Sequence, residues 1–166
     1  MSRLGVLALL MGLAGCAETA PPFETALAPV VRREGANLAA APVTLVSLQG
    51  APEGRARDFE AALKRELSSR GVAMTPAKSG HYGLRGYLAA WSEPGGANFS
   101  YVFDVYDRLR VRATRLDASF VVKGEGDAWS LMNDKTVDAL AAQSAEDIAA
   151  WLSQTPEAAP ALSYTQ

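Results

Sequence analysis

Apolar and polar positions repeat with two different periods between residues 43 and 153. Residues 43–48 are a short apolar run, rich in valine and leucine, that ends at a Gly- and Pro-containing segment; this pattern predicts a central strand. From about Arg55 to Arg70 the apolar side chains share one face and the charged side chains lie away from it, which predicts an amphipathic helix. Gly71 follows as the expected C′ residue of that helix.

The segment after this helix predicts further strands. Residues 72–74 are a short apolar run closed by a proline, and residues 82–91 and 99–106 alternate apolar and polar positions. Residues 107–110 then form the connection of a hairpin, whose second strand runs through residues 111–122. Hairpins of this kind bury one face and leave the other face in water.

The last apolar stripe predicts a second helix. Val137, Leu140 and Ile148 have helical spacing, and Asn133 or Asp134 is placed to cap the first turn. A strand, a helix, several strands and a final helix are the order of an α+β fold. We therefore expect a mainly antiparallel sheet of about five strands with two helices packed on one face.

A separate apolar run, residues 4–15, begins after Arg3. It holds about a dozen residues, whereas a helix that spans the membrane needs ~20. A positive start, an apolar stretch and small residues before a cleavage point are typical of a secretory signal. The alternatives are a short transmembrane helix or a buried core segment, but the prolines and glutamates of residues 17–29 argue against a longer spanning helix.

The apolar run ends in Leu13-Ala14-Gly15-Cys16, which resembles the lipobox of bacterial lipoproteins. In that family the cysteine is acylated and becomes the first residue of the mature protein, so the resemblance implies a lipid anchor at Cys16. The next residue is Ala17 rather than aspartate, which in proteobacterial lipoproteins favours export to the outer membrane. The expected location is therefore the outer membrane, with the protein facing the periplasm.

These features divide the chain into four expected parts. They are a signal peptide (residues 1–15), the lipidated cysteine with a flexible tether (16–41), an α+β domain (42–154) and a loose tail (155–166). About 150 residues remain once the signal is removed, which is the size of one ordinary domain.

Composition and charge exclude several classes of function. The formal net charge of -2 gives no basic footprint for nucleic acid. With its single cysteine acylated, the chain has no thiol left for disulfides, zinc–thiolate sites or a cysteine nucleophile. A domain without free cysteines also suits the oxidising periplasm.

Candidate catalytic groups are few. His81 is the only histidine, it lies in a predicted surface turn, and no G-x-S-x-G elbow occurs. Asp104 and Asp107 would divide acid and base roles only if their environments separated their pKa values. We expect instead that Asp104 points to solvent and that Asp107 begins a turn. The sequence predicts no catalytic residues, no metal and no cofactor; a periplasmic hydrolase or small-ligand-binding protein is the alternative.

Arginines near the hairpin are the candidate partner-binding residues: Arg108, Arg110, Arg112 and Arg115. Three of them recur at period two, so we expect them to form a basic ridge on one strand face. Such a ridge would bind phosphate, lipopolysaccharide or an acidic partner through guanidinium contacts. The alternative is a solvated face whose arginines pair with aspartates across strands. Tyr87 and Trp91 join the candidates, because aromatic residues and arginine are enriched at interface centres.

The order and spacing of elements over residues 43–153 resemble a group of uncharacterised alphaproteobacterial lipoproteins, mainly through Leu84-Arg85-Gly86-Tyr87 and residues 101–107. The pattern resembles more weakly the amino-terminal domain of TolB and the lipoproteins that activate penicillin-binding proteins. These are assembly and scaffold proteins, so the resemblance implies a non-enzymatic lipoprotein that binds an envelope protein during assembly or maintenance. Self-assembly into a ring, as in related lipoprotein families, is a further alternative, and the oligomeric state stays open.

Overall fold

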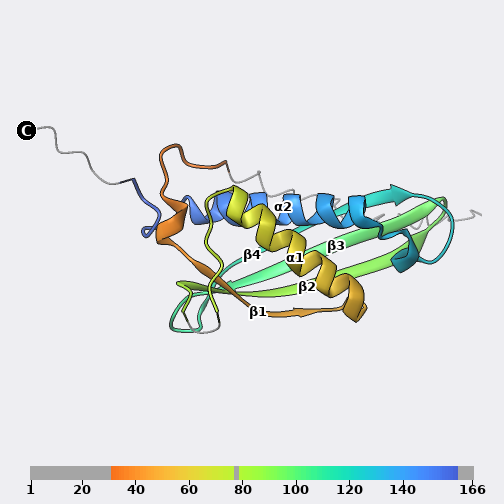
Figure 1. Cartoon of the computed structure of the whole chain (residues 1–166), viewed down its shortest axis with the longest axis horizontal. Coiled ribbons are helices and arrows are strands. Elements are labelled where there is room, and N and C mark those ends of the chain that lie inside the picture. The colour runs from red at the N-terminus through yellow and green to blue at the C-terminus, as the bar shows by residue number, and fades with distance from the viewer. Residues whose placement is uncertain (1–30, 77–78, 161–166) are drawn as a thin grey trace, which may run out of the picture.

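The computed structural model describes residues 31–76 and 79–160 as one layer of helices on a sheet (Figure 1). The expected signal peptide, Cys16 and the first half of the expected tether lie outside the described residues. The elements are η1 (Leu38–Ala40), β1 (Val43–Gln49), α1 (Glu53–Ser69), β2 (Tyr82–Glu93), β3 (Gly96–Tyr106), β4 (Arg112–Lys123), η2 (Ala128–Leu131) and α2 (Asp134–Leu152).

The sheet has four strands in the order β1-β2-β3-β4. β1 and β2 are parallel and are connected through α1, whereas β2, β3 and β4 form antiparallel hairpins. Both helices cover the same face, as Figure 1 shows. The predicted α+β class and helix placement are confirmed, but the expectation of about five mainly antiparallel strands is corrected to four strands in a mixed sheet.

The missing strand is the run at residues 72–74. Met74 makes only an isolated parallel bridge with Val43 on β1. Pro76 follows two residues later and has no N–H with which to continue a ladder. The run therefore borders β1 without becoming a strand of the sheet.

Alternation along β2 and β3 decides which side of the sheet becomes the core. On β3, Phe99, Tyr101, Phe103 and Val105 are all fully buried under the helices. The phenol of Tyr101 donates a hydrogen bond to Asp147 on α2, and burial first, then this carboxylate, raises the pKa of the tyrosine. The predicted apolar alternation of both strands is confirmed.

The second helix begins where its capping residue was expected. The Oδ1 of Asn133 accepts a hydrogen bond from the backbone N–H of Thr136 at 3.0 Å, which satisfies one of the free donors of the first turn. The predicted stripe of Val137, Leu140 and Ile148 is buried. These contacts fix α2 over the sheet beside α1.

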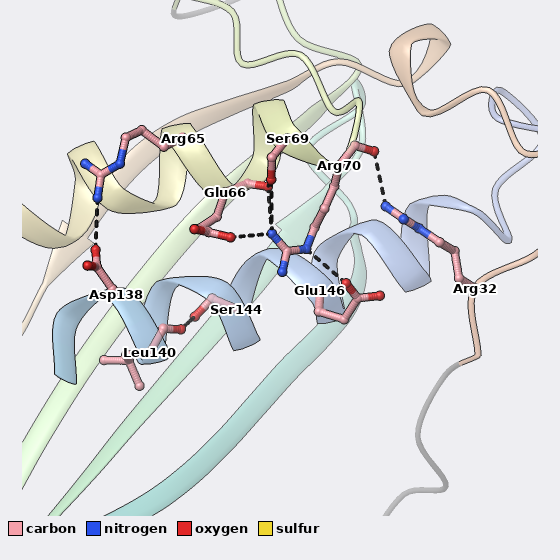
Figure 2. A network of polar contacts seen from close by, with 9 residues as sticks. All are labelled: Arg32, Arg65, Glu66, Ser69, Arg70, Asp138, Leu140, Ser144 and Glu146. Carbon is pink, nitrogen blue, oxygen red and sulfur yellow. Dashed lines mark hydrogen bonds and ion pairs between the residues drawn. The ribbon is translucent and has the colours of Figure 1, made fainter. Parts of the chain in front are cut away.

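Ion pairs connect the two helices at the surface (Figure 2). The guanidinium of Arg70 donates to Glu66 at 2.5 Å and to Glu146 on α2 at 2.9 Å. Nearer the start of α1, Arg65 donates a hydrogen bond to Asp138 on α2 at 2.9 Å. The side chain of Arg70 is mostly covered, whereas the Arg65–Asp138 pair is largely exposed, so the former contributes more to the helix interface.

The packed part of the chain extends beyond residues 42–154 at both ends. Leu38, expected in the tether, is buried, and the backbone N–H of Asn37 donates to the carbonyl of Ala158 at 2.9 Å. The backbone N–H of Arg33 also donates to Ser153 Oγ, at 2.8 Å. Residues 31–41 are therefore bound to the domain, and the segment up to Ala158 is not a loose tail.

Candidate functional site

The face of β2, β3 and β4 that points away from the helices is the candidate site, and we call it the open sheet face. Among the described residues, both helices lie on the opposite side (Figure 1). The cross-strand pairs of β2, β3 and β4 define rows of side chains across this face. From the 107–111 turn toward the far end, the rows are Tyr106–Arg112, Arg85–Asp104–Arg115, Tyr87–Val102–Asp117, Ala89–Ser100–Ser119 and Trp91–Asn98–Val121.

Asp104 is the centre of a charged cluster at one end of this face. Arg115 donates to both of its carboxylate oxygens, from Nε at 2.8 Å and from Nη2 at 2.9 Å. Arg112 adds an ion pair at 3.6 Å. The hydrogen bonds from Arg115 hold the pKa of Asp104 below its ordinary value, against the opposing effect of burial.

The expectation that Asp104 points to solvent is wrong. Its strand position does face away from the core, but only 4% of the residue is exposed, because arginine side chains cover it. Arg85 completes the cluster from β2, with its guanidinium 5.0 Å from the centroid of the Tyr106 ring in a cation–π arrangement. The alternative of arginines paired with aspartate across strands describes Asp104 correctly.

The predicted arginine ridge does not form as one row. Arg108 and Arg110 lie in the turn between β3 and β4, and Arg110 has a φ of 62°. Only Arg112 and Arg115 lie on β4, where a bulge at Ala113 shifts the register. The extra residue brings these two arginines to the same face despite their three-residue spacing, so a period-two ridge cannot describe them.

Exposed aromatic side chains lie in the middle and far rows of the open sheet face, among small and polar side chains. Trp91 is 45% exposed and Tyr87 is 39% exposed. The indole Nε1 of Trp91 donates to Glu93 at 3.1 Å. Beside it, Oδ1 of Asn98 is buried and has no hydrogen-bond partner among the described residues. An unpaired acceptor and an exposed indole therefore lie next to each other.

A second polar cluster surrounds His81 near the start of β2. Its Nε2 lies 3.3 Å from Glu157, and its Nδ1 lies 3.1 Å from Arg108 Nη2. Glu157 also accepts a hydrogen bond from the Tyr82 hydroxyl at 2.6 Å. Burial, then this carboxylate, raises the pKa of Tyr82 to about 12, and the same hydrogen bond lowers the pKa of Glu157.

The geometry does not assemble the hydrolytic set considered from the sequence. His81 contacts Glu157 and Arg108, whereas Asp104 is occupied by Arg115. The Oδ1 of Asp107 accepts a hydrogen bond from the backbone N–H of Val111 at 2.9 Å, so Asp107 begins the turn, as predicted. Within residues 31–76 and 79–160, no group of three or more potential ligands is placed to hold a metal ion.

Sequence patterns missed three contributors to these clusters. Arg85 is part of the segment that carries the resemblance but is not singled out as a site residue, Asn98 is not a candidate either, and Glu157 lies in a segment predicted to be loose. Only tertiary packing brings Glu157 beside His81.

A surface cavity of about 620 Å³ lies away from the open sheet face, where residues 32–39 meet Arg70 and Gly71 at the end of α1. In the described part of the chain, no helix has both the length and the apolarity needed to cross a membrane.

Comparisons with known proteins support the fold alone. No protein-family model and no curated protein matches the chain. Among solved structures, a variant PelC dodecamer from Paraburkholderia phytofirmans is similar, with a TM-score of 0.52 and 13% identity, over 75% of this chain and 96% of that one. A lipoprotein candidate from Caulobacter crescentus CB15 aligns with a TM-score of 0.41 and 15% identity, over 69% of this chain and 89% of that one. The resemblances to TolB and to penicillin-binding-protein activators therefore rest on sequence pattern alone.

Proposed function

We propose that this protein is a non-enzymatic lipoprotein, anchored in the outer membrane through Cys16 and facing the periplasm, that binds an envelope protein. The anchor is supported by the lipobox-like Leu13-Ala14-Gly15-Cys16 at the end of a signal-like segment. The absence of catalysis is supported by the way His81 and Asp104 are each held by other partners.

The packing of residues 31–41 shortens the reach of the domain from its anchor. If the folded part begins at Val31, only about 14 residues separate it from Cys16. A chain of that length spans at most about 50 Å, even when fully extended. The start of the folded domain therefore lies within about 50 Å of the membrane, and the partner must meet the domain there.

The open sheet face is the observation that carries the proposed binding role. Exposed aromatic side chains in its middle and far rows and arginines at its opposite end are the residue types enriched at interface centres. Basic side chains outnumber the acidic ones on this face, although the whole chain has a net charge of -2. We therefore propose a protein partner that presents acidic side chains beside an apolar patch.

Site-specific photo-cross-linking tests this surface. A photoreactive residue at Ala89, which is exposed between Tyr87 and Trp91, should form an adduct with the partner in intact cells. The same residue at Lys64, exposed on α1, is the matched control and should not. Trp91→Ala should reduce the Ala89 adduct about tenfold or more, as expected for an interface anchor. Adducts from Lys64 alone, or an unchanged yield with Trp91→Ala, would exclude the open sheet face.

Fractionation of Cys16→Ser tests the anchor separately. Several acyl chains, as in lipoproteins that carry a similar lipobox, exceed the single chain that gives only marginal membrane binding. The Cys16→Ser protein should therefore leave the outer-membrane fraction. If it stays there, a protein partner or the apolar N-terminal segment retains it, and the proposed lipid anchor is unnecessary.

Self-assembly is a second candidate function, favoured by one specific observation. The fold is similar to that of PelC, whose solved form is a dodecamer. A ring requires a head-to-tail interface between different surfaces of neighbouring copies. Measurement of the mass of the full chain in detergent tests this candidate, and a protein that remains a single copy would exclude it.

A further inference from the structure

β4 is an edge strand with a free side. It pairs with β3 on one side, and no described element pairs with it on the other. The strand is long, running from Arg112 to Lys123, and contains no proline. Edge strands present unpaired N–H and C=O groups, and proteins normally shorten, cover or interrupt them. The bulge at Ala113 interrupts this edge at one end, and its charged side chains admit only a strand whose charges match their positions.

The core beside this edge is also incompletely covered. Leu116, Phe120 and Val122 point to the helix side and pack against the core, but each is only half-buried. Their counterparts on β3, such as Phe103 and Phe99, are fully buried. An added strand at the β4 edge, with its own helix layer on the same side, would cover the exposed parts of these side chains.

We infer that a second copy of this chain pairs its β4 with β4 in an antiparallel arrangement, about a twofold axis through Ala118. A twofold perpendicular to the sheet places the helix layers of both copies on the same side. Side chains directly opposite one another must then share a face, so the axis passes through a residue rather than between two residues.

Like charges along β4 and the bulge at its start exclude several positions for that axis. An axis at Arg115 or at Asp117 would place each of these residues opposite its own like charge. An axis at Ser119 would place Arg115 opposite Lys123. An axis at Leu116 would draw the bulge at Ala113 into the paired segment and break the ladder.

The axis at Ala118 avoids each of these conflicts and keeps the longest ladder, whereas an axis at Phe120 also avoids them and places Asp117 opposite Lys123 but pairs only residues 117–123. It pairs residues 114–122, all beyond the bulge. On the helix side, Leu116 of each copy lies opposite Phe120 of the other, which joins the two half-covered parts of the core. On the open sheet face, Arg115 lies opposite Val121 and no like charges face each other.

A cysteine on the axis gives a direct test. In this arrangement the two Ala118 Cα atoms face each other across an antiparallel pair, at about 4.5–5.5 Å, which lies within the range of disulfides. The full chain with Cys16→Ser and Ala118→Cys has one cysteine, and in detergent it should oxidise to a disulfide-linked dimer in high yield. The control with Leu116→Cys in place of Ala118→Cys should oxidise at least tenfold less. A stronger cross-link at Leu116, or none at either position, overturns the inferred pairing.

Opposite charges at Val121 test the same register without a disulfide. This side chain is 56% exposed, so either charge is compatible with folding. In the dimer, Val121→Lys places a lysine opposite Arg115 at two symmetric positions, which is repulsive. Val121→Glu places a glutamate opposite Arg115 at the same two positions, which is attractive. The dimer dissociation constant, measured by sedimentation in detergent, should be about 2- to 30-fold weaker for Val121→Lys and tighter for Val121→Glu. Equal constants for the two variants, or a chain that remains a single copy, would contradict the pairing.

Discussion

At the scale of single residues, the cluster around Asp104 shows how an open face acquires a buried charge. Arg115 lies across the carboxylate and shields it, while its own side chain stays about half exposed (52%). The pair thus combines a covered acceptor with a guanidinium that can still contact a partner. A fixed guanidinium loses less side-chain freedom on binding than a free one, which favours its use at an interface.

Removal of Arg115 tests the energetic role of this pair. Arg115→Ala leaves the buried Asp104 without its two hydrogen bonds, so we expect the free energy of unfolding to fall by about 1–3 kcal/mol. Arg112→Ala removes only the longer 3.6 Å contact and should cost less than about 1 kcal/mol. Urea denaturation of both variants measures the difference. Equal losses would show that the two hydrogen bonds from Arg115 stabilise the fold no more than the longer ion pair from Arg112.

Acid should weaken the fold through the same carboxylate. The pKa of Asp104 is lower in the folded state than the ordinary value of about 3.9 expected in the unfolded chain. Its contribution is therefore complete above that ordinary value and is lost as the pH falls below it through the folded-state pKa. Glu157, whose pKa is also lowered, acts in the same direction, and its ordinary value lies slightly higher.

Asp104→Asn measures how much of this acid sensitivity comes from the cluster around Asp104. The variant should lose about 1–2 kcal/mol at pH 7 and should change less between pH 6 and pH 3 than the parent protein. Asp117→Asn removes an exposed charge from the same face and serves as the control. If Asp104→Asn kept the full acid dependence of the parent, another carboxyl would be responsible. Denaturant midpoints measured at each pH decide between these outcomes.

At the scale of elements, close approach between strands depends on a missing side chain at Gly86. A Cβ at this position would lie 2.7 Å from Cε1 of Phe103 and 2.8 Å from Cδ1 of Leu48, both on the core side. The ring of Phe103 therefore occupies the space that a Cβ at Gly86 would need.

Gly86→Ala should therefore destabilise the protein by about 1–3 kcal/mol, through displacement of Phe103 in a packed core. Gly54→Ala on α1 is the matched control, since nothing lies within 4 Å of its Cβ position and alanine favours a helix. The control should be neutral or stabilising by up to about 1 kcal/mol. Thermal and urea unfolding of both variants measure the contrast, and a neutral Gly86→Ala would mean that the ring moves aside freely.

The elements that the sequence predicted well are those with strict periodicity. The two long strands, both helices and the capping residue Asn133 follow from local pattern. The bulge at Ala113 has no such signal, since β4 alternates acceptably in either register. That single residue decides which arginines share a face, so the candidate site was less predictable than the fold around it.

At the scale of the whole molecule, the domain includes chain on both sides of the predicted limits. Residues 31–41 and 153–158 meet at the end of α2, where backbone and side-chain hydrogen bonds join them. Figure 2 shows Arg32 from this segment donating to the carbonyl of Arg70 at the end of α1. Composition alone had indicated a tether, because alanine- and proline-rich sequence carries no periodic signal. The contacts that order this segment are with distant parts of the chain.

Truncation measures how much this segment contributes. A chain that begins at Val43 loses the burial of Leu38, about 1.5–3 kcal/mol, and several hydrogen bonds of about 0.5–1.5 kcal/mol each. The backbone entropy of ordering these residues offsets part of that gain. Compared with a chain that begins at Val31, we expect a net loss of about 1–3 kcal/mol by urea denaturation. Leu38→Ala in the longer chain should reproduce most of the loss, since the buried side chain is the largest single contribution. Equal midpoints for the two lengths would instead place the start of the folded domain near residue 42, and the reach from the membrane would then be the longer one expected from the sequence.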